Sequence, residues 1–180
     1  MPFFLTDLTA LRPVNLQFMH ADIPLNHPKS SAKTHIARPH LILAIIGIAL
    51  SIYAIWAHGR IEAGQSAGCT ISDSISCDAV LGSKWGKFFG IPLGYYGGIF
   101  WAIVLVTAIS SPGTNLKNAA LQRLGVATVG LLFSLGLFYI AEFVIHKTCP
   151  ICLSTHITSL VNFVFAVVSW RKISKKAPQS

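Results

Sequence analysis

The chain has 180 residues, of which 53% are hydrophobic and only 11% are charged. Soluble domains of average composition carry roughly 25% charged residues, so this composition indicates a single-domain integral membrane protein. The net charge of +8 could suggest nucleic-acid binding, but the Lys and Arg residues lie between apolar runs and form no basic face. We therefore predict no nucleic-acid partner.

The N-terminal segment, residues 1–39, contains five prolines and no sustained hydrophobic period. That pattern predicts a mobile cytoplasmic leader. The apolar run that follows is longer than the core of a signal peptide and starts late in the chain, so we interpret it as a membrane anchor that is retained.

Four apolar stretches are candidates for crossing a hydrocarbon core of about 30 Å, which takes roughly 20 helical residues. They span residues 40–57, 93–109, 119–143 and 152–170. The sequence therefore predicts an all-α integral membrane protein, a bundle of four transmembrane helices within a domain at 40–172. A basic cytoplasmic tail follows at 173–180.

The distribution of basic residues predicts the orientation, because Lys and Arg near the ends of spans are retained in the cytoplasm. With both termini inside, ten basic residues face the cytoplasm. Four face outward, namely Arg60, Lys84, Lys87 and Lys147. We expect the termini in the cytoplasm.

The loop between the first two spans has roughly 30 residues, a length that is uncommon unless the loop is functional or disordered. Within it, residues 78–89 mix apolar and basic positions, which predicts a short helix in the membrane interface, where Trp85 would be well placed. Pro92 is then expected in the first turn of the second span.

All four cysteines fall on the outward side in this topology, in the compartment where disulfides persist. Cys149 and Cys152 form a Cys-x-x-Cys motif where the last span begins, and Pro150 suits the first helical position. The free N–H groups of a helix start stabilise a thiolate, so this motif predicts a redox pair within reach of a lipid-soluble electron carrier.

Cys69 and Cys77 lie in the polar loop, where a disulfide would be accessible to a soluble protein. The two pairs together suggest a relay by thiol–disulfide exchange. Two structural disulfides in a scaffold or sensor remain an alternative. A zinc site is disfavoured by the spacing of the loop pair, and haem attachment is excluded because Leu153 follows the second Cys of the motif.

Three ordered motifs carry a resemblance to a known family: Cys-x7-Cys at 69–77, GSKWGKFFG at 82–90, and Cys-Pro-Ile-Cys at the start of the last span. In this combination the chain resembles the vitamin K epoxide reductase family over about residues 40–172. The resemblance implies a quinone (ubiquinone or menaquinone) inside the bundle. It also implies a separate thioredoxin-like dithiol partner and, for a bacterial-type member, an inner-membrane location with periplasmic cysteines.

The resemblance further implies roles for single residues. Cys69 would exchange with the partner, Cys77 would relay to Cys149, and Cys152 would face the quinone. Four more residues would contribute to the quinone site: Ser83 as a loop serine near it, Trp85 and Phe89 as its cap, and His156 as a hydrogen-bond donor to the quinone. Considered without the family, His156 and Ser83 are more simply explained as a packed polar residue and a locally bonded loop serine.

The expected activity is thiol oxidation that passes electrons to the quinone and promotes disulfide formation in the partner. Reduction of a quinone epoxide by the same cysteines is the alternative. Leu93 stands where vertebrate members of the family carry a substrate-contacting asparagine, which weakens the epoxide alternative.

Overall fold

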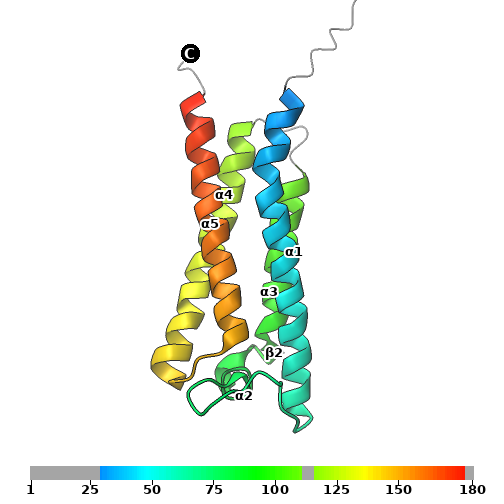
Figure 1. Cartoon of the computed structure of the whole chain (residues 1–180), viewed down its shortest axis with the longest axis vertical. Helices are drawn as coiled ribbons and strands as arrows, with labels where there is room; N and C mark the ends of the chain where they lie inside the picture. Colours follow the sequence, from blue (N-terminus) through cyan, green and yellow to red (C-terminus); the bar gives the residue numbers. More distant parts are fainter. Residues whose placement is uncertain (1–28, 111–115, 177–180) are drawn as a thin grey trace, which may run out of the picture.

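The computed structural model describes residues 29–110 and 116–176 of the chain. Its described part is mostly helical. Helices α1 (Lys29–Glu62), α3 (Leu93–Ile109), α4 (Leu116–Tyr139) and α5 (Pro150–Lys176) run along the long axis. Figure 1 shows α2 (Cys77–Leu81) and strand β2 gathered at one end of these helices, opposite the end where the chain terminates.

Helix α1 begins earlier than the sequence predicts and passes through Pro39. Residues 29–39 of the segment expected to be a leader are therefore helical, while residues 1–28 lie outside the described part. Proline in a helix removes one hydrogen bond and crowds the preceding turn. The residues on either side of Pro39, rich in Ala, Lys and Leu, favour helix strongly enough for α1 to continue.

The other long helices match the predicted spans closely. Helix α3 has the predicted bounds, and α4 starts three residues before its predicted start. Beyond Tyr139 the helix continues as a π-helical turn, η3 (Ile140–Ile145), which ends at His146 in the left-handed conformation. Helix α5 begins at Pro150, which confirms the proline as the first helical residue.

The four long helices pack as a closed ring in the order α1, α3, α4, α5. Glycines permit the close approaches: a Cβ atom at Gly47 would lie 2.1 Å from the Trp101 ring, and one at Gly130 would lie 2.1 Å from the Phe100 ring. These contacts bring α3 against α1 on one side and against α4 on the other. Small residues at helix interfaces are typical of membrane bundles.

The outer surface of the bundle is apolar. Large side chains on α1, α3, α4 and α5 are exposed around it, among them Ile52 at 61% and Leu132 at 65%. Three helical segments are long and apolar enough to cross a membrane: Arg38–Glu62, Leu116–Ile145 and Pro150–Lys175. Helix α3 is also apolar but has 17 residues, fewer than the roughly 20 that cross a hydrocarbon core. The protein is an integral membrane protein.

The loop region departs from the single interfacial helix predicted at 78–89. It forms α2, a 3-10 turn η2 (Lys84–Gly86), and a hairpin of β1 (Lys87–Phe88) and β2 (Ile91–Pro92). A two-residue turn with positive φ at Phe89 and Gly90 joins the strands, which is the backbone geometry that suits a tight hairpin. Pro92 accordingly caps α3 from outside its first turn.

Gly86 explains why no single helix forms here. A Cβ atom at Gly86 would lie 2.0 Å from the Leu81 carbonyl oxygen, so the chain folds back on α2 at a position where only glycine fits. The sequence pattern of apolar and basic residues carried no sign of this backbone contact.

Candidate active site

The loop cysteines are joined as a disulfide between Cys69 and Cys77, with their Cα atoms 5.6 Å apart. Cys77 is fully buried at the start of α2, whereas Cys69 is partly exposed in the preceding loop. The oxidised pair therefore presents one sulfur-bearing residue toward solvent and the other toward the protein interior.

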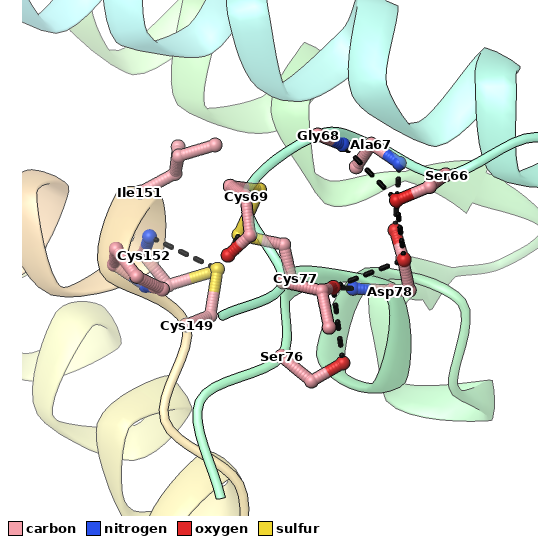
Figure 2. The surroundings of a disulfide bond; sticks show 12 residues. Ser66, Ala67, Gly68, Cys69, Ser76, Cys77, Asp78, Cys149, Ile151 and Cys152 are labelled. Carbon is pink, nitrogen blue, oxygen red and sulfur yellow. Dashed lines mark hydrogen bonds between the residues drawn. A yellow bond between two sulfur atoms is a disulfide. The ribbon is translucent and has the colours of Figure 1, made fainter. Parts of the chain in front are cut away.

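The carboxylate of Asp78 holds the segment that carries Cys69. It accepts hydrogen bonds from the Ala67 backbone N–H at 2.7 Å, the Ser66 hydroxyl at 2.8 Å and the Thr70 hydroxyl at 3.0 Å. Figure 2 shows the bonds from Ser66 and Ala67 to Asp78 beside the disulfide. The Ala67 amide is the main cause that lowers the pKa of Asp78 below its ordinary value, so the carboxylate stays ionised as an acceptor.

Helix α1 holds the same segment from the other side. The Tyr53 hydroxyl donates to the Ala67 carbonyl at 3.1 Å, and Arg60 Nε donates to the Ser66 carbonyl at 2.9 Å. Cys69 is thus held between the end of α1 and the start of α2, although it lies in a glycine- and serine-rich loop.

Cys149 and Cys152 are free thiols at the start of α5. Cys149 precedes the first helical residue, its carbonyl accepts the Leu153 N–H at 2.8 Å, and its sulfur accepts the Cys152 N–H at 3.3 Å. A hydrogen bond from the Cys152 thiol is the largest cause that lowers the pKa of Cys149, and the N–H groups of Cys152 and Ile151 add to it against the opposing effect of burial. These hydrogen bonds favour the thiolate form of Cys149.

A β-bridge joins the two cysteine pairs. Ile75 pairs with Thr148 in parallel, the Ser76 N–H donates to the Thr148 carbonyl at 3.0 Å, and the Thr148 N–H donates to the Ser74 carbonyl at 2.9 Å. Cys77 and Cys149 are the residues that follow these paired segments, and they belong to one buried cluster. Figure 2 shows Cys149, at the start of α5, beside the disulfide.

An apolar cavity of about 340 Å³ opens between the helices beside Cys152. Ligand pockets in proteins span roughly 300 to 1,000 Å³. Hydrophobic side chains of α1, α3 and α4 form most of the wall, and the chemically reactive or polar groups include Cys152, His156 and Ser134. The cavity thus places one thiol of the helix pair against an apolar binding space.

The predicted cap and donor residues do not all meet at this cavity. Trp85 and His156 line it, but Phe89 is at the tip of the hairpin, 87% exposed and stacked edge-on against Phe88. Ser83 caps η2, donating to the Val80 carbonyl at 2.8 Å and accepting from the Trp85 N–H at 3.2 Å. Leu93 also lines the cavity.

Sequence reasoning missed Ser134, a buried residue of α4 whose hydroxyl lies 2.7 Å from His156 Nδ1. It lies in a run of otherwise apolar residues. A polar residue inside an otherwise apolar span is the signal that could have identified it.

The sequence profile of the vitamin K epoxide reductase family matches residues 38–167, which is more than half of the chain. This chain belongs to the vitamin K epoxide reductase family. The resemblance drawn from the cysteine and Lys-Trp-Gly motifs is thereby confirmed, and membership makes the protein a membrane oxidoreductase.

Two curated relatives in this family are similar over most of their length. Vitamin K epoxide reductase complex subunit 1 of Rattus norvegicus is 28% identical over 152 residues, covering 76% of this chain and 89% of the relative. The protein of the same name from Mus musculus is 26% identical over 145 residues, covering 74% and 88%. The vitamin K epoxide reductase domain thus accounts for nearly all of the described structure.

Proposed function

We propose that this protein is a quinone-dependent thiol oxidoreductase that reoxidises a thioredoxin-like dithiol protein and so promotes disulfide formation. One observation carries the proposal. Cys149 packs in the same buried cluster as Cys77, while its partner Cys152 lines an apolar cavity. Electrons can therefore enter at the loop pair and leave at the cavity.

The first exchange takes place at Cys69. A thiolate of the reduced partner attacks the Cys69 sulfur, the Cys69–Cys77 bond breaks, and Cys77 leaves as a thiolate. The second thiolate of the partner then displaces Cys69. The partner has lost two electrons and two protons, and the loop pair carries the electrons.

The second exchange passes the electrons inward. With the helix pair oxidised, the Cys77 thiolate attacks the Cys149 sulfur and releases Cys152 as a thiolate. Cys69 then attacks Cys77, which restores the loop disulfide and frees Cys149. The product has a disulfide at 69–77 and thiols at 149 and 152, which is the redox state of this structure.

The cavity fits a quinone because it is apolar, adjacent to a thiol and equipped with an imidazole. A bound quinone would accept two electrons and two protons as Cys149 and Cys152 join in a disulfide. In the tautomer whose Nδ1 accepts from the Ser134 hydroxyl, Nε2 of His156 carries the ring proton and can donate to a quinone oxygen. Trp85, 41% exposed, covers the cavity on the loop side.

We also propose that α3 crosses the membrane as the fourth span. Its 17 residues extend about 26 Å, and a local thinning of the bilayer accommodates a helix a few ångströms short. Both termini then lie in the cytoplasm, and the cysteines lie on the outer side, which for a bacterial inner membrane is the periplasm.

The proposal is tested by anaerobic quinone reduction with purified protein and a reduced thioredoxin-like donor. We expect Cys152→Ala to abolish quinone reduction even after chemical pre-reduction of the protein. We expect Cys69→Ala to block oxidation of the donor while pre-reduced protein still reduces quinone. Wild-type turnover in both variants would contradict the relay.

The names of the rat and mouse relatives favour a second candidate, reduction of a quinone epoxide. In that reaction the same thiols supply two electrons and two protons, and the epoxide becomes quinone and water. Supplying the purified protein with a reduced dithiol and either quinone or quinone epoxide separates the two activities by the product that accumulates.

A further inference from the structure

The second exchange requires Cys77 and Cys149 to meet, and the segment before Cys149 is held by several contacts that the proposed chemistry does not itself use. Thr148 is at the centre of them. Its backbone makes both bonds of the bridge to Ser74 and Ser76, and its hydroxyl donates to Glu142 Oε1 at 3.0 Å. Glu142 is partly buried on the π-helical turn at the end of α4.

The π-helical turn is what brings this carboxylate to Thr148. The turn widens the end of α4, the chain then reverses at His146 in the left-handed conformation, and the Lys147 N–H returns to the Ala141 carbonyl at 3.1 Å. Single π-turns and left-handed non-glycine residues both carry a conformational cost, and both are found preferentially at functional sites.

Lys147 adds a further contact between this segment and the cysteine loop, because its ammonium group donates to the Asp73 carbonyl. Residues 147 and 148 therefore hydrogen-bond to the loop at residues 73, 74 and 76. Glu142 hydrogen-bonds to Thr148 from the side of α4. A loop rich in Ser and Gly needs such anchoring if two sulfurs are to approach reproducibly.

We propose that Glu142, acting through the Thr148 hydroxyl, is the positioning residue for electron transfer between the two cysteine pairs. It orients the strand-like segment that presents Cys149 to Cys77, and it does not line the cavity beside Cys152. This inference rests on the proposed function, since it concerns the step between the loop pair and the helix pair.

The test separates three reactions of Glu142→Ala in purified protein. The rate at which fully oxidised protein consumes the first equivalent of reduced donor measures reduction of the loop pair. The rate at which the second equivalent is consumed measures electron transfer from the loop pair to the helix pair. The rate of quinone reduction by pre-reduced protein measures the exit step, in which the helix pair reduces the quinone. We expect only the rate of consumption of the second equivalent to fall. The decrease should be about tenfold, which is the rate change that the loss of one hydrogen bond can cause. A wild-type rate of quinone reduction by the pre-reduced variant also shows that the variant is folded.

Conservative variants distinguish positioning from proton transfer. Glu142→Gln keeps an oxygen that accepts from Thr148, so we expect it to restore the rate. Thr148→Ser should likewise be near wild type, whereas Thr148→Val, which keeps the backbone bridge but not the hydroxyl, should match Glu142→Ala. The matched control is Glu62→Ala, which removes an exposed acid at the same end of the bundle, paired with Lys87.

Three results would overturn the inference: equal loss in Glu142→Gln and Glu142→Ala, slowing of the exit step, or no change in the second equivalent. Failure of the proposed function looks different, because wild-type protein would then reduce no quinone and consume only stoichiometric donor.

Discussion

Cys77 and Cys149 each follow a segment of the same short β-bridge, and this local arrangement turns two separate cysteine motifs into neighbours. The sequence predicted both pairs, the helical start at Pro150, and the placement of His156 one turn beyond Cys152. It could not predict the bridge itself, because the residues 74–76 and Thr148 are 72 or more positions apart and have no distinguishing pattern.

The predicted cap illustrates the limit of reasoning from a motif. Trp85 and Phe89 are four residues apart, a spacing that places two side chains on one face only if the segment is a helix. The backbone instead turns at Gly86 and again at the hairpin, so Trp85 lines the cavity and Phe89 does not. Ser83 makes the local bonds common for loop serines.

This difference predicts opposite behaviour for two aromatic substitutions. Trp85→Ala should raise the KM for quinone by about tenfold, because it removes one wall of the cavity. Phe89→Gly should leave the KM unchanged and suits the positive φ of 50° at that position. Steady-state quinone reduction measures both, and a larger KM effect from Phe89→Gly than from Trp85→Ala would show that the hairpin closes over the quinone.

At the scale of elements, the long helices were well predicted because long apolar runs have few competing structures in a membrane. The ends of these helices were less predictable. Helix α1 extends through Pro39, and α4 ends in a π-turn that no residue type in the sequence predicts. Gly94 of α3 permits close approach to α1, since a Cβ there would lie 2.8 Å from an Ile55 side-chain carbon.

Two glycines of α4 provide a matched test of this packing. Gly130→Ala should lower the thermal stability of the protein in detergent, because overpacking against Phe100 costs about 1 to 3 kcal/mol and exceeds the gain in helix propensity of about 1 kcal/mol. Gly136→Ala meets no atom within 4 Å and should be neutral or stabilising. Equal stability of the two variants would show that the α3–α4 contact is looser than described.

For the whole molecule, the bundle is asymmetric along its axis. The four cysteines and the loop lie at one end, and α1 starts and α5 ends at the other (Figure 1). Such polarity suits an enzyme that takes electrons from a protein at one face and delivers them to a carrier within the membrane. Family membership and three apolar spans establish the oxidoreductase and its membrane setting, whereas partner and quinone depend on the proposed chemistry.

The proposed relay depends on direct thiol–disulfide exchange between Cys77 and Cys149. This exchange is tested most directly in the double variant Cys69→Ser, Cys152→Ser, in which Cys77 and Cys149 are the only cysteines that remain. After mild oxidation, proteolysis and mass spectrometry, we expect a Cys77–Cys149 disulfide within single chains as the main product. Free thiols, or cross-links only between chains, would contradict it.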